Sequence, residues 1–426
     1  MAIRSRVREA ARRLALGVVL ALGAGVGLGD DVKGVPDVRR GSRGVRLDLP
    51  HLGTTPVHIP QSAPTGVVLL LHRGGSAAEI AALTHAVPWH VLLVDVDVAR
   101  LSAPDASASC DATSALLEDI SRRAQREAGL TTYHRPVVVA TTGALPVAAA
   151  ALQGASPAVL PAAVSVGSPV AATRPACVPA TTRRITTAAA QRWRYAPTPL
   201  ALASPLEDAL GVAANDTPRA ATDVQRWLQH FDLPLTAAWS SHPCGMLVLL
   251  SPARGWREAD EALSRRLADA GIHVVGIDAL QSFWQRRSPR DVALELQRLT
   301  DALASTGLPV YVGGREFGAE TMAVAAEMMP SNHQVAGVVL VDPGPTAFFE
   351  VEPPALALRP LGPSEWSTRA AVQQLDRPTL CVTHAPSPAA RLCESLARRG
   401  QATHARSGAD VSALAHTIAS FIRPPS

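Results

Sequence analysis

The stretch GGREFGAE, residues 313–320, lies between an apolar run typical of a β-strand and a run typical of a helix. A strand, a tight glycine-flanked turn and a helix form the context of a nucleophile elbow, which has the pattern G-x-S-x-G. Here Glu316 occupies the nucleophile position between Gly314 and Gly318. The sequence therefore predicts an elbow-like turn that carries a carboxylate. An ordinary strand-to-helix glycine turn remains the alternative.

A second copy of this pattern lies earlier in the chain. The run PVVVATTGA from Pro136 resembles PVYVGGREFGA from Pro309, and Thr141 stands at the elbow position of the first copy, where serine is expected. The run GVVLLLHRGG from Gly66 resembles GMLVLLSPARG from Gly245 in the same way. The repeat unit is therefore a whole domain.

The apolar runs show no polar alternation and are separated by helical patterns, which is typical of parallel sheets covered on both faces. We therefore predict an α/β fold with two doubly wound domains in tandem, residues 47–237 and 238–426. A helix is expected to begin at Ser288 and Pro289, with a capping box completed by Asp291. The proline-rich segment 189–241 is expected to be an irregular crossover.

The N-terminus has the pattern of a signal peptide over residues 1–29. Five arginines precede an apolar, glycine-rich run at residues 14–29. That run is shorter than the roughly 20 apolar residues of a spanning helix, although a membrane anchor is the alternative. We therefore predict a cleaved leader and an exported, periplasmic protein.

Five cysteines in an exported chain indicate disulfides and one remaining thiol. Cys381 and Cys393 are close in sequence, and Cys110 and Cys177 flank one predicted domain, so we pair them in this way and expect Cys244 to be free. The net charge of +4 is too small to indicate a nucleic-acid partner. No cofactor is predicted. No metal site is predicted either, because the histidines lack paired ligand spacing.

The second half resembles the VirJ/AcvB family of exported bacterial virulence proteins, which have an α/β-hydrolase-like fold. The first half resembles the additional N-terminal domain of longer AcvB-type members. The resemblance rests on the Cys381 and Cys393 pair and on motifs that occur in the family's order, at residues 255–256, 276–278, 283–289, 314–320 and 348–351. It implies a periplasmic esterase that acts on aminoacylated phosphatidylglycerol, or an accessory role in virulence-associated secretion.

The chain departs from the family pattern at the residues that carry the chemistry. Glu316 replaces the serine, and the loop after the Cys381 strand lacks the family's acidic residue. No histidine lies between Gly408 and the final helix, so His404 is the nearest stand-in for the base. Because serine-type acyl transfer needs nucleophile, base and acid together, we predict a pseudo-hydrolase. An active or altered esterase that uses Glu316 or Thr141 is the alternative.

A pseudo-hydrolase of this kind would bind an anionic or aminoacylated phospholipid headgroup, or an envelope or secretion protein. Trp256, Trp284, Arg286 and Arg287 are candidate headgroup residues, because arginine suits phosphate. Core tryptophans and solvated arginines are the alternative. We expect the Glu316 carboxylate to fold back onto the N-terminus of the next helix, neutralised by Arg315 or Arg254. In the alternative it points into an open cleft and favours cationic groups. With base and acid missing, a serine at position 316 is not expected to restore hydrolysis.

Overall fold

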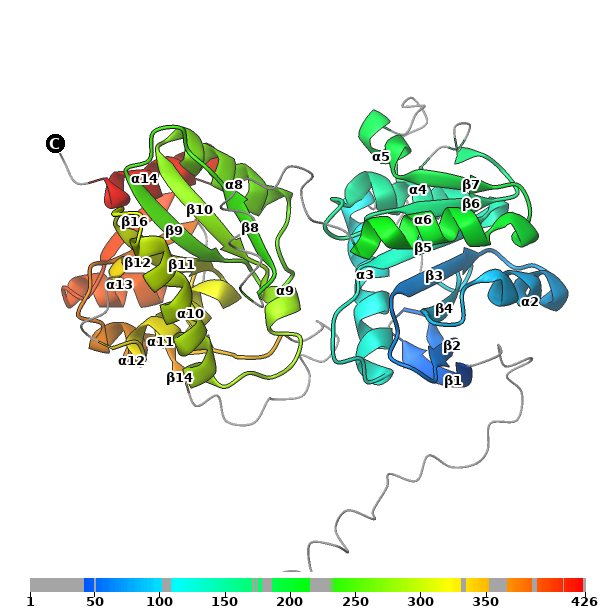
Figure 1. The fold of residues 1–426 in the computed structure, drawn as a ribbon, viewed down its shortest axis with the longest axis horizontal. Helices are drawn as coiled ribbons and strands as arrows, with labels where there is room; N and C mark the ends of the chain where they lie inside the picture. Colours follow the sequence, from blue (N-terminus) through cyan, green and yellow to red (C-terminus); the bar gives the residue numbers. More distant parts are fainter. Residues whose placement is uncertain are drawn as a thin grey trace, which may run out of the picture. The chain divides into compact units, whose positions relative to one another are not determined.

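A computed structural model of the chain describes residues 42–49, 51–101, 109–170, 173, 175–177, 186–214, 231, 233–330, 335–351, 366–384, 389–408 and 410–423. The predicted signal peptide lies outside these residues. Within them, no helix combines the length and the apolar character needed to span a membrane. Two seven-stranded sheets organise the described chain, and each is treated by itself (Figure 1).

The first sheet has the strand order β1-β2-β4-β3-β5-β6-β7. Strands β3 to β7 are all parallel to their neighbours among these five strands, whereas β2 is antiparallel to both β1 and β4. The strands are β1 (Ser42–Leu49), β2 (Gly53–Pro60), β3 (Val67–His72), β4 (Leu92–Asp97), β5 (Pro136–Thr141), β6 (Ala163–Val166) and β7 (Trp193–Ala196).

The second sheet has the strand order β8-β10-β9-β11-β12-β15-β16. Only β8 is antiparallel to its neighbour, and the other pairs are parallel. The strands are β8 (Leu235–Ala238), β9 (Gly245–Leu250), β10 (Ile272–Ile277), β11 (Val310–Arg315), β12 (Val335–Val341), β15 (Thr379–His384) and β16 (Thr403–Ser407). A separate small ribbon pairs β13 (Thr346–Ala347) with β14 (Trp366–Ser367).

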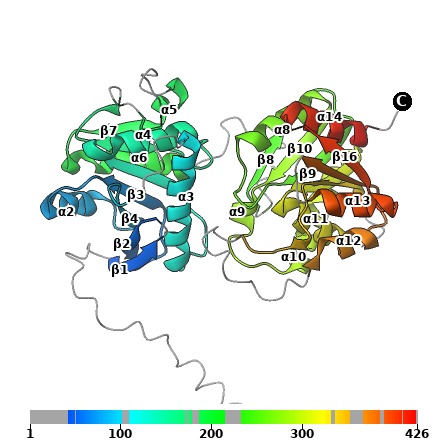
Figure 2. The ribbon, with the colours of Figure 1, turned by 180° about the vertical axis from the view of Figure 1, so that it is seen from behind.

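Helices cover both faces of each sheet, as Figures 1 and 2 show from opposite sides. In the first half, α3 and α4 bury one face, and α2 and α6 bury the other. In the second half, α8 and α14 bury one face, and α10 to α13 bury the other. The helices are α2 (Ala77–Ala86), α3 (Cys110–Glu127), α4 (Leu145–Gly154), α5 (Thr187–Gln191), α6 (Ala203–Ala214), α8 (Glu258–Asp269), α9 (Ala279–Ser282), α10 (Pro289–Ala304), α11 (Phe317–Glu327), α12 (Thr368–Gln374), α13 (Ala390–Arg398) and α14 (Val411–Ile422), with short 3-10 turns η1 (Thr142–Ala144) and η3 (Pro199–Ala201).

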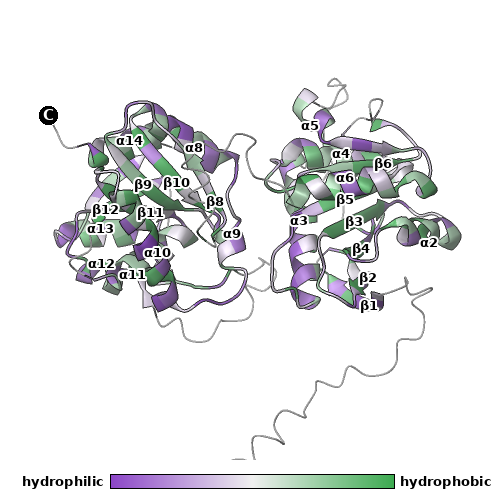
Figure 3. Ribbon diagram, viewed as in Figure 1, coloured by the Kyte–Doolittle hydropathy of each residue, from purple (hydrophilic) through white to green (hydrophobic). Residues whose placement is uncertain are grey.

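The central strands of both sheets are hydrophobic (Figure 3). In β3 and β9, for example, every residue is buried. Strands covered on both faces need apolar side chains in both directions, which explains the runs without polar alternation. The predicted doubly wound α/β architecture is confirmed.

The strand orders also confirm the predicted duplication. In the first sheet, the antiparallel strand β2 is followed across the sheet by the second, first, third, fourth and fifth parallel strands of the chain, which are β4, β3, β5, β6 and β7. The second sheet has the same order, with β8 followed by β10, β9, β11, β12 and β15. The matching runs from Gly66 and Gly245 form β3 and β9, and those from Pro136 and Pro309 contribute β5 and β11. Strand β8 belongs to the second sheet, so the predicted boundary at residues 237 and 238 falls within it.

Two local expectations need correction. The segment 189–241 is not simply an irregular crossover, because β7, α6 and β8 lie in it. Two of its prolines are tolerated, since Pro199 opens η3 and Pro205 lies in the first turn of α6, where a missing N–H costs little. Helix α10 begins as predicted after Ser288, but the Ser288 side chain makes no capping hydrogen bond.

Both predicted disulfides are present, Cys110–Cys177 and Cys381–Cys393, and Cys244 is free. The second bridge ties strand β15 to helix α13 within the core, where both sulfur-bearing residues are fully buried. It therefore holds the middle of β15 against the helix that follows it.

We expect replacement of both Cys381 and Cys393 by alanine to lower the free energy of unfolding by about 3 kcal/mol. The bridge closes a loop with a sequence separation of 12, and the loss of chain restriction accounts for that magnitude. Urea denaturation of the oxidised proteins measures the change. The matched control is Cys244→Ala, which leaves both bridges intact. An unchanged midpoint in the double variant, or a bridged Cys244 in non-reducing peptide maps, would contradict the assignment.

Candidate functional site

The turn between β11 and α11 has the backbone geometry of an elbow. Glu316 has φ 51° and ψ −118°, and α11 begins at the next residue. Its backbone N–H donates to the carbonyl oxygen of Val341 on β12 at 2.8 Å, which holds the turn against the neighbouring strand. Positive φ is costly for a residue with a Cβ, and such strain is typical of functional sites. The predicted elbow is therefore present at Glu316.

The two glycines of the motif are required by close backbone approach. A Cβ at Gly314 would lie 2.2 Å from the carbonyl carbon of Gly318. A Cβ at Gly318 would lie 2.2 Å from the carbonyl oxygen of Leu250, at the end of β9. Any larger residue at either position would force strand, turn and helix apart. The G-x-x-x-G spacing is thus explained by packing.

The Glu316 side chain is exposed and makes no capping hydrogen bond with helix α11. Nor does it form an ion pair with any residue in the described part of the chain. Arg315, expected as its neutralising partner, instead pairs with Asp260 on α8 at 2.5 Å. The expected fold-back onto the helix is therefore not observed, and the carboxylate lies open at the edge of the sheet.

Glu320, one helical turn after the elbow, adds a second carboxyl group. Its Oε1 accepts a hydrogen bond from the backbone N–H of Gly344 at 2.8 Å. Burial and, to a smaller extent, the negative charge of Glu316 raise the pKa of Glu320, and the Gly344 hydrogen bond opposes them, with a resulting pKa of about 7. This carboxyl group therefore changes its charge near neutral pH.

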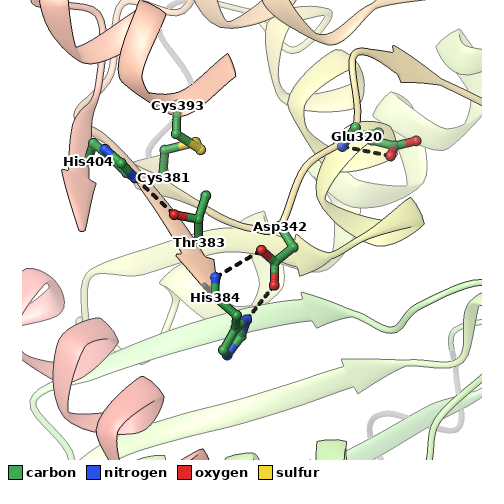
Figure 4. The surroundings of a disulfide bond; sticks show 8 residues. Glu320, Asp342, Cys381, Thr383, His384, Cys393 and His404 are labelled. Carbon is green, nitrogen blue, oxygen red and sulfur yellow. Dashed lines mark hydrogen bonds and ion pairs between the residues drawn. A yellow bond between two sulfur atoms is a disulfide. The ribbon is translucent and has the colours of Figure 1, made fainter. Parts of the chain in front are cut away.

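A histidine and an aspartate meet on the next two strands, and the sequence analysis missed them. Asp342 follows β12 with a φ of 50°, and His384 ends β15. The Asp342 Oδ1 accepts from the His384 backbone N–H at 3.0 Å, and Oδ2 contacts the ring Nδ1 (Figure 4). Polar residues at the ends of adjacent parallel strands are the signal that could have revealed this pair.

His404, the stand-in for the base, lies on β16. Its Nε2 lies 3.0 Å from the Thr383 Oγ1 (Figure 4), so the ring points to that hydroxyl on β15. No hydrogen bond joins His404 to Glu316 in the described part of the chain. Its proposed role as a base stays a prediction without geometric support.

The predicted headgroup residues are not gathered at one open surface. Trp256 is 8% exposed and Trp284 is 1% exposed, so both are core side chains. Trp256 covers Gly276, where any Cβ would lie 2.2 Å from its ring. Arg287 pairs with Glu295 at 2.6 Å, whereas Arg286 is exposed.

The first half lacks the elbow. Thr141 has φ −73° and ψ 164°, which is ordinary extended backbone. The half does hold a histidine–aspartate pair, in which the His72 Nε2 lies 2.6 Å from the Asp95 Oδ1. The His72 Nδ1 lies 3.2 Å from the carbonyl oxygen of Gly74, so both ring nitrogens are engaged. Thr141 therefore has neither the strain nor the available base of a nucleophile.

No group of three or more metal-ligating side chains with suitable geometry occurs among the residues that the structure describes. The site is thus built from an exposed carboxylate on the elbow, a second carboxyl group behind it and an Asp–His pair beside it. Such a set can bind a cation or transfer a proton.

Solved structures with a similar fold each cover somewhat less than half of this chain. TT1662 from Thermus thermophilus is 19% identical with a TM-score of 0.33, over 45% of this chain and 92% of that one. Est1E from Butyrivibrio proteoclasticus is 12% identical with a TM-score of 0.31, over 44% and 92%. MenH from S. aureus is 10% identical with a TM-score of 0.34, over 44% and 96%. No match was found among curated proteins.

The family comparison agrees with the motifs and with the elbow. A family described as bacterial virulence protein (VirJ) matches residues 245–409, from the first residue of β9 to just beyond β16. This range holds Glu316, Glu320, Asp342 and His384. The predicted resemblance is confirmed for this range: residues 245–409 are similar to the VirJ family.

Proposed function

We propose that this protein is an exported, hydrolase-like binding protein that holds a positively charged group at the elbow of its second half without hydrolysing esters. The observation that carries the proposal is the exposed Glu316 carboxylate at φ 51° on the elbow, with no neutralising partner in the described residues. A serine hydrolase presents a neutral hydroxyl at this point, whereas this protein presents a fixed negative charge.

The chemistry of a carboxylate argues against ester turnover. Attack by Glu316 on an ester carbonyl would give an anhydride, which is a poor intermediate for this substrate class. The altered-hydrolase alternative would have to use either Glu316 in this way or Thr141, which is not on an elbow. Binding without turnover is therefore the better supported function.

The charges around the elbow favour a cationic ligand. Arg315, the neighbour of Glu316 in sequence, is already paired with Asp260, and Arg287 is paired with Glu295. Glu316 and Glu320 lie on the same helical turn and repel each other. The family resemblance implies a phospholipid headgroup as the ligand. The aminoacylated headgroup carries an ammonium group, so it suits this acidic site better than the unmodified, anionic headgroup does.

The cellular setting of the proposal is the periplasm. Two disulfides are compatible with an oxidising compartment, and the predicted leader at residues 1–29 would direct export. An envelope or secretion protein that presents a lysine or an N-terminal amine would satisfy the same acidic elbow. The lipid headgroup is our first candidate because the VirJ resemblance implies it.

We expect the purified mature protein to release no amino acid from lysyl-phosphatidylglycerol above a Glu316→Ala control. The reason is the carboxylate at the nucleophile position. Thin-layer chromatography of the lipid or a free-lysine assay measures the release. Turnover that disappears in Glu316→Ala or in Thr141→Ala would refute the proposal that the protein binds without hydrolysis.

We expect stronger binding to vesicles that contain lysyl-phosphatidylglycerol than to vesicles of phosphatidylglycerol alone. Glu316→Gln should weaken the first interaction by about two- to fivefold, the worth of one exposed ion pair. The matched control is Asp269→Asn, which removes an exposed carboxylate at the far end of α8. Vesicle co-sedimentation measures both. Equal weakening by the two variants, or a preference for the unmodified lipid, would point to another ligand.

Binding of the cationic vesicle should strengthen as the pH rises from 6 to 8. The Glu320 carboxyl group has a pKa of about 7, so it is neutral below this range and negative above it. Glu320→Gln should flatten the rise, since glutamine does not titrate. The difference between the two pH profiles isolates Glu320 from other titrating groups, and identical profiles would show that Glu320 does not face the ligand.

A further inference from the structure

In the Asp342–His384 pair, Asp342 holds one ring nitrogen of His384, and no described residue forms a hydrogen bond with the other. Both carboxylate oxygens of Asp342 face His384, one at the backbone N–H and one at Nδ1. A carboxylate at Nδ1 keeps the proton there and leaves Nε2 as the acceptor. In the described part of the chain Nε2 has no partner, and the His384 side chain is 25% exposed, so solvent reaches it.

The other histidine–aspartate pair of the chain provides a contrast. His72 has both ring nitrogens engaged, and its side chain is 8% exposed. His72 therefore has the pattern of a structural histidine, whereas His384 has the pattern of a base.

The strand register places this pair beside the elbow. The last residue of β11, Arg315, pairs with Val341, which pairs with Val382 on β15. Asp342 therefore follows β12 between the elbow and His384, at the same edge of the sheet. With about 4.8 Å between neighbouring strands, the backbones of Glu316 and His384 are about 10 Å apart.

Backbone strain marks the same edge. Of the three non-glycine residues with positive φ in the described chain, two are Glu316 and Asp342. Strained residues persist where the surrounding structure holds them, and they cluster at active sites. Glu316 and Asp342 follow the adjacent strands β11 and β12. The strained backbone of an active site is therefore present along this edge of the sheet, and not at the elbow alone.

We propose that Asp342 and His384 form a general-base pair for the elbow position, and that the glutamate at position 316 is the one element that prevents serine-type ester hydrolysis. The family histidine lies near the C-terminus, so the base here comes from a different strand. This inference goes beyond the proposed binding function and does not depend on the ligand. It reverses the expectation that a serine at position 316 would be inactive.

The chemistry follows from the free nitrogen. In Glu316→Ser the hydroxyl oxygen attacks the ester carbonyl carbon, and its proton passes to the His384 Nε2. The bond to the alcohol breaks, and the leaving alkoxide takes that proton. Water then attacks the carbonyl carbon of the acyl-serine and passes a proton to Nε2. The bond between the serine oxygen and the acyl group breaks, the carboxylic acid leaves, and the serine oxygen takes the proton back from Nε2. Asp342 orients the ring and stabilises the imidazolium.

The test is the full chain with Glu316→Ser, assayed with p-nitrophenyl acetate. We expect at least a tenfold gain in p-nitrophenol release over both the wild type and Glu316→Ala. Mass spectrometry of the quenched reaction should show one acetyl group on the peptide that carries the introduced serine. Adding His384→Ala to this variant should abolish both signals. Adding Asp342→Asn should reduce the rate, and His416→Ala, an exposed histidine on α14, should leave it unchanged.

Circular dichroism and the melting temperature establish that each variant is folded. A folded Glu316→Ser protein with no gain in rate and no acetylated peptide would overturn the proposal. A gain that survives His384→Ala would overturn it as well, because the base would then lie elsewhere. Since the wild type is not expected to turn over in either case, neither result bears on the binding function.

Discussion

The turn at Glu316 is the constraint on which the second half depends. Its backbone lies in a region that costs a non-glycine residue of the order of 1–3 kcal/mol. The turn is held from two sides, by the hydrogen bond to Val341 and by the contact of Gly318 with the end of β9. Because strand, turn and helix meet without room for a Cβ at either glycine, the residue at position 316 is always presented at the carboxyl edge of the sheet. The chemistry at this edge is therefore set by which side chain stands there.

The two halves share one strand order but differ in the backbone and hydrogen bonding at the carboxyl edge of the sheet. They share the strand succession from β2 to β7 and from β8 to β15, and both carry an Asp–His pair. In the first half the Thr141 backbone is relaxed, and both nitrogens of His72 are engaged. In the second half the elbow is strained, and the His384 Nε2 has no partner among the described residues. The sheet provides the position, whereas the local backbone and the hydrogen-bond partners decide whether chemistry is available.

Ion pairing decides the electrostatic character of the elbow. Arg315 is next to Glu316 in sequence, yet successive residues of a strand point to opposite faces, and Arg315 reaches Asp260 on α8. The negative charge on the elbow is consequently left without compensation in the described residues. Burial then raises the pKa of Glu320 into the neutral range, which couples the charge of the site to pH.

The amino-acid sequence by itself determined the α/β class, the duplication, the disulfide pairing and the place of the elbow. These follow from local or repeated patterns: apolar runs without alternation, matched motifs, cysteine spacing and glycines around a turn. The tertiary structure alone decided what surrounds Glu316. Asp342 and His384 are 42 residues apart in sequence and meet only because β12 and β15 are neighbours in the sheet. The direction of Arg315, the burial of Trp284 and the free nitrogen of His384 depend in the same way on contacts between distant segments, which no local pattern encodes.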